Sequence, residues 1–307
     1  MDIQYEVLII GSGPGGMTAA IYASRAGLNT AILESSAPGG KLVKTHLVEN
    51  YPSYDSITGV DLAMKMHTHS LAFGANYLYG DVVKVDKIEG GFIVHSATGE
   101  TFTSKVVISA TGTVERQLGL TNEDKLLGKG VSYCAVCDGA FYRDEHVVVI
   151  GGGNSALEES IYLTQFAKKV TIVMRRDVFR ADKAAQDNVK RNPKIEILQH
   201  YIPKQFLLDE LGKVSGIKIQ HTNTNETIDL EAKAVFPYIG ADPASSYLSH
   251  LGITDEEGFV LVNQEMETGI PGLYAIGDMN SKTLRQIVTA TGDGSIAAQN
   301  AFKFLHS

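Results

Sequence analysis

The chain has 307 residues, of which 44% are hydrophobic, and a formal net charge of −8. This length predicts about two domains with sizeable cores, and the acidic balance argues against a nucleic-acid-binding protein. No run of roughly 18 apolar residues is present, so we expect no membrane span, and two cysteines in so long a chain are typical of a reduced, cytoplasmic protein.

A nucleotide-binding pattern begins close to the N-terminus. The apolar run Tyr5–Ile10 predicts a buried parallel strand, and Gly-Ser-Gly-Pro-Gly-Gly over 11–16 follows it directly. A helix over Met17–Ala26 and a strand over Thr30–Leu33 come next, and that strand ends in Glu34. Such glycines let a pyrophosphate approach the backbone at the helix N-terminus, while the acid accepts from a ribose hydroxyl. We therefore predict a dinucleotide-binding βαβ unit; a purely structural turn is the alternative.

The rest of the first half is expected to be a helix followed by a β-meander. The helix spans Asp61–Phe73, and the period-two pattern between Asp81 and Ala110 predicts the meander. His67 and His69 could suggest a metal site. However, they are two residues apart in sequence, which places them on different faces of the helix. We expect a solvated face and no metal there. The polar stretch Thr113–Glu123 predicts a crossing into a second domain.

The two cysteines form a motif of their own. Cys134 and Cys137 stand three residues apart, and Asp138 follows at once. A structural zinc site needs four ligands, and the sequence has no second cysteine pair. Inert buried cysteines would not explain why both fall within four residues. A redox dithiol beside a nucleotide turn is the favoured interpretation, with electrons moving between nucleotide and sulfur.

A second strand–turn–helix pattern follows the cysteines. Its turn is Gly-Gly-Gly-Asn-Ser-Ala over 151–156, and Met174 stands where the first pattern has its acid. Arg175 and Arg176 come next, and Arg180 lies a little further on. Arginines in place of a ribose-binding carboxylate suit a 2′-phosphate, so this turn predicts NADPH in preference to NADH. A solvated basic run is the alternative.

The last third of the chain is expected to return to the first domain. A second meander over 213–234 and a strand at Val235–Ile239 come before the return. An apolar stretch then ends at Asp278, which is placed for a polyol hydroxyl. A helical stretch is expected to open at Arg285, and we expect the last helix to span about Asp293–Leu305, with the aspartate as its N-cap.

Together these motifs resemble those of bacterial low-molecular-weight thioredoxin reductases over essentially the whole chain. The resemblance rests on the turns at 11–16 and 151–156, Ala110-Thr-Gly112, Cys134-Ala-Val-Cys-Asp138, the arginines, Gly277-Asp278 and Arg285-Gln-Ile287. It implies an α/β fold of two Rossmann-like dinucleotide-binding domains, each a three-layer ββα arrangement, the second inserted into the first. FAD would bind the discontinuous domain of residues 1–114 and 243–307. NADPH would bind the inserted domain, 115–242, which also carries the redox motif.

The resemblance also assigns individual residues. It places Cys137 nearer the flavin, gives the attack on thioredoxin to Cys134 and makes Asp138 the proton donor. The residues that it implies for FAD are Gly11, Ser12, Gly13, Pro14, Gly15, Gly16, Glu34, Gly39, Gly40, Lys41, Asn50, Val83, Ala110, Thr111, Gly112, Gly277, Asp278, Arg285, Gln286 and Ile287. Those that it implies for NADPH are Gly151, Gly153, Asn154, Ser155, Glu158, Arg175, Arg176 and Arg180. The chain departs from the family pattern at Lys41, often Gln, and at Met174, often His.

The implied function is thioredoxin-disulfide reduction by a homodimer. Electrons would pass from NADPH to FAD, then to the Cys134–Cys137 disulfide, then to thioredoxin or a similar small dithiol protein. Three alternatives stay open at this point. A flavin-dependent dithiol oxidase would not need the arginines, and a ferredoxin or flavodoxin reductase of the same fold would not need the cysteines. A nucleotide-sensing module without turnover would not bleach when NADPH is added.

Overall fold

The computed structural model describes residues 3–307, and the chain divides into two compact units. The first unit comprises the residues up to Val114 and from Asp242 onward, and the second is Glu115–Ala241. The second unit is thus inserted into the first. The segments that join them, β9 (Thr113–Glu115) and β17 (Ala241–Pro243), pair as a two-stranded ribbon.

The first unit is built on one seven-stranded sheet. Its strand order is β5-β2-β1-β8-β7-β6, and β18 pairs with β8. The strands β5, β2, β1, β8 and β18 run parallel, whereas β6, β7 and β8 form an antiparallel meander. Their bounds are β1 Tyr5–Ile10, β2 Thr30–Glu34, β5 Asn76–Tyr79, β6 Val82–Ile88, β7 Gly91–Ser96, β8 Thr101–Ser109 and β18 Leu273–Ala275.

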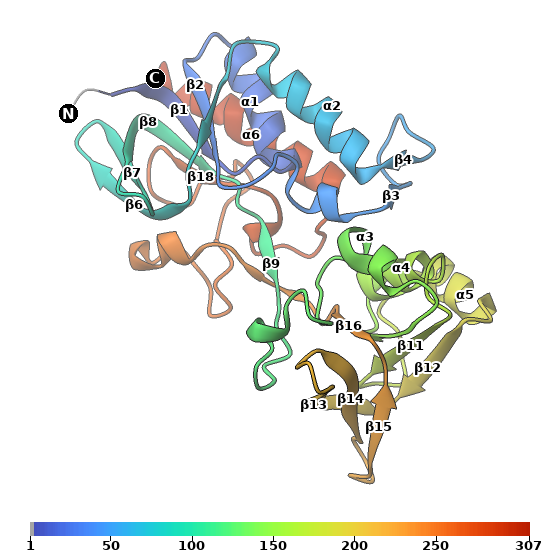
Figure 1. The fold of residues 1–307 in the computed structure, drawn as a ribbon. Coiled ribbons are helices and arrows are strands. Elements are labelled where there is room, and N and C mark those ends of the chain that lie inside the picture. Colours follow the sequence, from blue (N-terminus) through green and yellow to red (C-terminus); the bar gives the residue numbers. More distant parts are fainter. Residues whose placement is uncertain (1–2) are drawn as a thin grey trace. The chain divides into compact units, whose positions relative to one another are not determined.

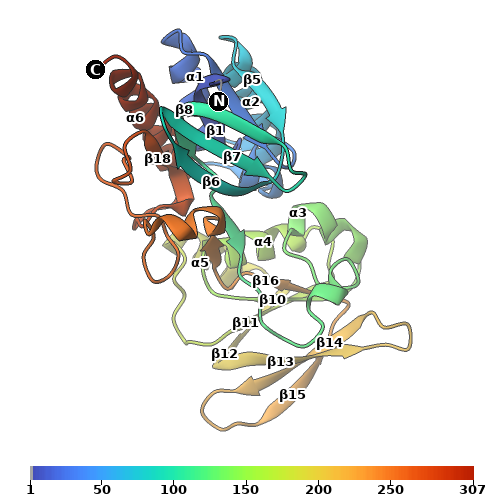
Figure 2. The ribbon, with the colours of Figure 1, turned by 90° about the vertical axis from the view of Figure 1, so that its left-hand side faces the viewer.

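Successive side chains of β1 point to opposite faces of the sheet, and both faces are covered. Val7 and Ile9 pack against alanines of helices α1 (Pro14–Arg25) and α6 (Ile287–Leu305), which lie side by side (Figure 1). Leu8 and Ile10 point to the other face and pack against residues of the β6–β7–β8 meander. Figure 2 shows the hairpin of β6 and β7 together with β8. The unit therefore has a helical layer, a parallel sheet and a β layer.

Several shorter elements complete the first unit. Helix α2 spans Gly59–Leu71 and has Thr58 as its N-cap, whose hydroxyl accepts from the amide of Asp61. The remaining elements are η1 (Gly40–Lys44), β3 (Leu47–Val48), β4 (Ile57–Thr58), η4 (Ser246–Leu251) and η5 (Gly277–Met279).

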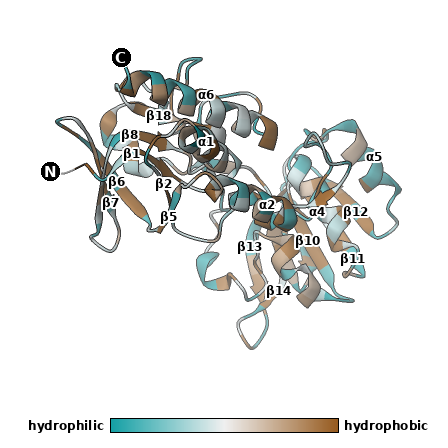
Figure 3. Cartoon of the chain, turned by 90° about the horizontal axis from the view of Figure 1, so that it is seen from above, coloured by the Kyte–Doolittle hydropathy of each residue, from teal (hydrophilic) through white to brown (hydrophobic). Residues whose placement is uncertain are grey.

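The second unit repeats the same plan on a smaller scale. Its parallel sheet has the order β12-β11-β10-β16, and a separate antiparallel sheet has the order β13-β14-β15. Val147 and Val149 of β10 pack beneath α4, while Val148 and Ile150 face the second sheet. Figure 3 shows hydrophobic stretches along these central strands. The bounds are β10 His146–Ile150, β11 Lys169–Met174, β12 Ile195–Gln199, β13 Tyr201–Leu208, β14 Val214–His221, β15 Thr227–Glu231, β16 Ala234–Pro237, η2 Asp124–Leu126, α3 Ala135–Asp138, η3 Gly139–Tyr142, α4 Asn154–Leu163 and α5 Lys183–Arg191.

The predicted start of the last helix at Asp293 is wrong, because the helical stretch expected from Arg285 and the last helix form one helix. Helix α6 begins at Ile287, and its N-cap is Gln286, which forms a reciprocal capping box with Thr289. Asp293 lies inside the helix, where its carboxylate accepts from the amide of Gly277 at 2.9 Å and from Lys282. A Cβ on Gly294 would lie 2.3 Å from the carbonyl oxygen of Gly15, so this glycine allows α6 to approach α1. Gly294 therefore serves the close packing of α6 against α1.

Other elements were not predicted at all. Helix α5 and the strands β12 and β13 fall in stretches that the sequence analysis left unassigned. Within residues 3–307, no helix is long and apolar enough to cross a membrane.

Candidate functional site

In the first glycine turn, Gly11 and Gly16 lie close to backbone atoms, whereas Gly13 has open space beside it. Gly11 has a φ of +102°, and a Cβ there would lie 2.6 Å from the carbonyl oxygen of Ala110. A Cβ on Gly16 would lie 2.0 Å from the carbonyl oxygen of Gly11, whereas one on Gly13 would meet no atom within 4 Å. The following helix, α1, has neither a side-chain cap nor an acidic residue in its first turn. This arrangement fits a pyrophosphate that approaches the backbone at Gly13.

Glu34 closes this turn through hydrogen bonds. Its Oε2 accepts from the amide of Ser12 at 2.7 Å and from the Ser12 hydroxyl at 2.8 Å. Its Oε1 accepts from the amides of Ser35 and Ser36. The Ser12 hydroxyl also pairs with that of Tyr77 at 3.1 Å, and burial raises the pKa of Tyr77. The acid therefore shapes the turn, and Tyr77 is a supporting residue that the sequence did not reveal.

Two predicted segments meet the turn directly. The amide of Gly39 donates to the carbonyl of Ser12 at 2.9 Å, and a Cβ on Gly40 would lie 3.4 Å from the Cα of Gly13. The amide of Ala110 donates to the carbonyl of Ile10 at 2.7 Å. Segments from three separate stretches of the chain thus line one turn.

Asp278 follows β18 and is half-buried. Burial raises the pKa of its carboxyl, while Lys41, Lys282 and Arg285 lower it. Arg285 supports the Asp278 loop: its Nε donates to the carbonyl of Asp278 at 3.0 Å, and its guanidinium lies 4.1 Å from the centre of the Phe259 ring. Burial is the largest effect, so the pKa of Asp278 lies above its ordinary value, and the three positive groups offset only part of this rise.

The other residues predicted to bind FAD lie just beyond β8, at or next to the start of α6 and in β6. Thr111 donates to the carbonyl of Ala244 at 2.7 Å, next to Gly112 at the end of β8. Asn50 donates to the side chain of Gln286 at 3.1 Å, just before Ile287 opens α6. Val83 lies in β6, at a register shift. The residues at 11–16, 34, 110–112 and 277–278 therefore share the carboxyl ends of β1, β2, β8 and β18, where ligands of such sheets bind.

The second glycine turn has the same shape as the first. Gly151 has a φ of +144°, and a Cβ there would lie 2.2 Å from the carbonyl oxygen of Tyr238. A Cβ on Gly153 would meet no atom within 4 Å. Asn154 is held by Asp182, to which its Nδ2 donates at 2.9 Å and from whose amide it accepts at 2.7 Å. Ser155 and Glu158 are exposed on α4. This turn thus leaves open space at Gly153, as the first turn does at Gly13.

The arginines lie on a loop that folds back on this turn. The amide of Arg180 donates to the carbonyl of Gly152 at 2.8 Å, and a Cβ on Gly152 would lie 3.3 Å from the methyl of Met174. Arg175, Arg176 and Arg180 are all exposed. No ion pair with a carboxylate of residues 3–307 holds any of the three. The loop thus offers guanidinium groups to an anion beside the turn.

Cys134 and Cys137 form a disulfide at helix α3. The sulfur of Cys134 accepts from the amide of Cys137 at 3.1 Å, and the amide of Cys134 donates to the Ser132 hydroxyl at 3.1 Å. Cys134 is buried, with 9% of its surface exposed, whereas Cys137 is exposed. The two sulfurs therefore differ in their access to a protein partner.

Tyr238 and Glu159 are polar residues that were not predicted, and both interact with the surroundings of helix α3. The amide of Ala135 donates to the hydroxyl of Tyr238 at 3.0 Å. Asp138 ends α3, and its charge adds to the burial that raises the pKa of Tyr142. On α4, burial and then the charge of Glu158 raise the pKa of Glu159 to about 8, and the Oε2 of Glu159 is buried without a hydrogen-bond partner. No sequence pattern marks Tyr238 or Glu159, because neither belongs to a motif.

An exposed aromatic residue follows the redox motif. Phe141 lies in η3 with 81% of its surface exposed, four residues beyond Cys137. Large apolar side chains that face water beside a reactive group are typical of a protein-binding surface. Its position next to the cysteines is the signal that would have identified it in the sequence.

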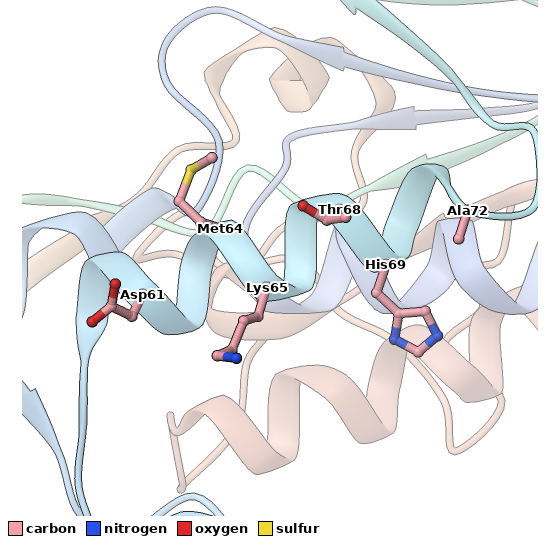
Figure 4. Close-up of a pocket in the computed structure, with 6 residues that line it drawn as sticks. All are labelled: Asp61, Met64, Lys65, Thr68, His69 and Ala72. Atoms are coloured by element: carbon pink, nitrogen blue, oxygen red, sulfur yellow. The ribbon is translucent and has the colours of Figure 1, made fainter.

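Helix α2 carries an open hollow on its outer face, with a volume of about 470 Å³. Figure 4 shows the six side chains that line it: Asp61, Met64, Lys65, Thr68, His69 and Ala72. Met64 is 50% exposed and the neighbouring Val60 47%. Residues 3–307 contain no group of three or more His, Cys, Asp or Glu side chains arranged to hold a metal.

Comparison with known proteins gives consistent matches. The family model described as pyridine nucleotide-disulphide oxidoreductase matches residues 5–294. The chain is 47% identical to the thioredoxin reductase of Listeria innocua over 302 residues, 98% of this chain and 94% of the relative. It is 48% identical to that of Bacillus subtilis over 297 residues, 96% and 93% of the two chains. The crystal structure of Lactococcus lactis thioredoxin reductase (FR conformation) matches with a TM-score of 0.96, 41% identity and 99% coverage of both chains.

Proposed function

Because the chain belongs to the pyridine nucleotide-disulphide oxidoreductase family, we propose that it is a thioredoxin-disulfide reductase that draws its electrons from NADPH. The observation that carries this proposal is the Cys134–Cys137 disulfide, whose exposed residue Cys137 lies in the same compact unit as a dinucleotide turn. A flavin and a nicotinamide are the cofactors of this family. When bound, a flavin would supply the two-electron chemistry that links hydride transfer from the nicotinamide to reduction of the disulfide.

We assign FAD to the first unit. The open space at Gly13, the uncapped start of α1 and the carboxylate of Glu34 support a pyrophosphate and a ribose at the first turn. Asp278 supports the binding of further hydroxyls, because its carboxyl oxygens are hydrogen-bond acceptors just beyond the carboxyl end of β18. The other residues of the FAD set stay predictions, among them Lys41, Asn50 and Val83.

We assign NADPH to the inserted unit. The open space at Gly153 suits a second pyrophosphate, and the exposed guanidinium groups of Arg175, Arg176 and Arg180 suit the 2′-phosphate. Met174 packs against Gly152 rather than offering an acceptor to the ribose. The hydrogen bonds that tie Asn154 to Asp182 give this asparagine a scaffolding role beside its predicted contact with the cofactor.

Reduction of the disulfide takes two electrons and two protons and leaves two thiols. The exposure of Cys137 supports it as the thiolate that attacks thioredoxin, which is the reverse of the role implied by the resemblance. In that step a bond forms between Cys137 and one thioredoxin sulfur, and the other thioredoxin sulfur leaves and takes a proton. Cys134 then attacks the Cys137 sulfur, which restores the disulfide and releases reduced thioredoxin. Asp138, at the end of α3, is proposed as the proton donor.

The partner surface is proposed to include Phe141. This ring is 81% exposed, and no more than a few residues separate it from the sulfur that thioredoxin must reach. An aromatic side chain supplies a large apolar contact at a small cost in conformational entropy.

The function is tested by anaerobic titration with NADPH, followed by oxidised thioredoxin with insulin as the final acceptor. We expect a yellow protein with one FAD per chain that bleaches on addition of NADPH and regains its colour with thioredoxin. A native protein that is colourless, or that bleaches without reducing thioredoxin, contradicts the proposal.

The two glycines of the first turn supply a matched pair of substitutions. Gly13→Ala is expected to fold normally, within about 0.5 kcal/mol of the native free energy of unfolding, because φ is −70° and the added methyl meets no atom. The methyl would enter the space assigned to the pyrophosphate and weaken FAD retention by ~1–3 kcal/mol. Gly16→Ala is expected to lose ~3 kcal/mol or more of stability, because its methyl would lie 2.0 Å from a backbone oxygen.

These two outcomes are separated by chemical denaturation and by the fluorescence of released flavin. Full FAD retention in a folded Gly13→Ala protein would show that the open space at this glycine is not the pyrophosphate site.

We propose a second copy of this chain as the occupant of the α2 surface. Asp61 lies one helical turn before Lys65 and two before His69 on the same face (Figure 4). Two such helices, antiparallel about a twofold axis, would set the aspartate of each copy against the basic residues of the other. The exposed Val60 and Met64 supply apolar surface to the same interface.

Met64→Glu is expected to convert a dimer into a monomer in sedimentation velocity at micromolar concentration. A charge buried among apolar side chains without a partner costs ~2–4 kcal/mol, which weakens dimerisation by about 30-fold to 1,000-fold. Leu211→Glu is the control, because it adds the same charge at an 80% exposed site of the inserted unit. A monomeric native protein, or a Met64→Glu dimer, excludes this interface.

A further inference from the structure

We propose that Tyr238 is a positioning residue that holds the Cys134–Cys137 pair in register for closing its disulfide. The inference rests on the proposed function, in which this pair opens and closes once in every turnover. Its physical basis is the hydrogen bond in which the amide of Ala135 donates to the Tyr238 hydroxyl at 3.0 Å.

This hydrogen bond acts on the residue that starts the redox helix. Ala135 is the first residue of α3, which has only four residues, follows Cys134 as its N-cap and contains Cys137. The first amides of a helix have no partner within the helix, and a single turn is unstable on its own. An external acceptor for the amide of Ala135 therefore fixes where α3 begins and how its cysteines face one another.

The other contacts of the motif do not replace it. The amide of Cys137 donates to the sulfur of Cys134, an acceptor that changes whenever the disulfide opens. The amide of Cys134 donates to the hydroxyl of Ser132, only two residues away in the same segment. Tyr238 is the acceptor that belongs to another element, 103 residues distant in sequence, and its oxygen does not change with the redox state of the sulfurs.

Tyr238 is itself anchored firmly. It directly follows strand β16, and its amide donates to the carbonyl of Ile150 at 2.7 Å, next to the second glycine turn. Its ring packs against the hydrophobic core of the inserted unit. The tether thus joins the redox helix to the rigid parallel sheet of the same unit.

The surroundings keep the Tyr238 hydroxyl neutral. Burial raises its pKa, and the nearby Glu159, Glu115 and Asp138 raise it further, while the hydrogen bond from Ala135 lowers it. Asp138 is the last residue of α3, and Glu159 projects from α4. A hydroxyl that stays protonated across the working pH range accepts from Ala135 without adding a negative charge beside a thiolate.

By fixing the start of α3, Tyr238 keeps the two thiols close together, so each thiol experiences a high effective concentration of the other. Disulfide closure gains from thiols that are already held close together, so loosening the start of α3 disfavours the disulfide relative to the dithiol. Opening is affected less, because the bond itself holds the two sulfurs together in the oxidised state.

The test is Tyr238→Phe, which removes one oxygen atom and leaves the ring. We expect the effective concentration of the thiols to fall about tenfold, which raises the midpoint potential of the dithiol by about 30 mV in glutathione equilibration. The mixed disulfide with thioredoxin should persist longer, and kcat should fall about tenfold with little change in KM for thioredoxin. Anaerobic flavin reduction by NADPH should keep its native rate.

Tyr201→Phe is the matched control, because it makes the same change on β13 of the same unit, away from the motif. It should leave the dithiol potential and kcat unchanged. An unchanged potential in folded Tyr238→Phe overturns the inference, even if its stability falls. Failure of the native protein to reduce thioredoxin overturns the proposed function instead.

A second measurement needs no variant. In the native protein, the amide of Ala135 is expected to exchange with deuterium slowly in both the oxidised and the reduced state, because its acceptor persists. Fast exchange of this amide in the reduced state contradicts the tether even if Tyr238→Phe fails to fold.

Discussion

Cys134→Ser and Cys137→Ser are each expected to lower the rate of thioredoxin reduction by about 10³-fold or more, while NADPH still reduces the flavin at the native rate. Each variant lacks one of the two sulfurs needed to form and resolve the mixed disulfide, and loss of a reacting group typically costs this much or more. The measurements are the insulin-coupled assay and anaerobic stopped-flow absorbance of the flavin.

The two variants are expected to differ in the intermediate that they trap. Cys134→Ser keeps the exposed Cys137, so it should accumulate a mixed disulfide with thioredoxin that nothing resolves. Cys137→Ser keeps only the buried Cys134 and should trap far less. The reverse pattern in non-reducing mass spectrometry would restore the role of attacking thiol to Cys134, as the resemblance implies. Native turnover by Cys137→Ser would exclude the dithiol as the electron conduit.

The Arg175→Ala, Arg176→Ala double variant is expected to bind NADPH more weakly by ~2–4 kcal/mol, because two charge-assisted hydrogen bonds to the 2′-phosphate are lost. This corresponds to an increase in KM of roughly 30-fold to 1,000-fold for NADPH and to little change for NADH. Both arginines are exposed, so the substitutions should leave the free energy of unfolding within about 0.5 kcal/mol of the native value.

Steady-state kinetics with each nucleotide measures this selectivity. Lys190→Ala, Arg191→Ala is the control, because it removes the same charge from the end of α5. Equal losses with NADPH and NADH would show that the two arginines do not recognise the 2′-phosphate. An equal effect of the control would show that net charge alone steers the nucleotide.

The local motifs were predictable from the sequence because short-range chemistry specifies them. A buried strand, a glycine turn and a helix follow one another within about 15 residues at both nucleotide turns, and backbone sterics require glycine where φ is positive. The two turns, Glu34, the arginines and the Cys134–Cys137 pair were all identified in this way. The family resemblance added the α/β fold with its inserted second domain, which the structure and the comparisons confirm.

Tertiary structure alone decided which groups meet. Asp293 has the residue type of an N-cap, but it accepts from the amide of Gly277 inside α6, because packing of α6 against α1 outweighs the local signal. The difference in exposure between Cys134 and Cys137 depends on the neighbours that cover one sulfur and leave the other open. The contact between Tyr238 and Ala135 joins residues 103 positions apart. Sequence spacing fixes chemistry within a turn or a helix, whereas burial and long-range hydrogen bonds exist only once the sheets have formed.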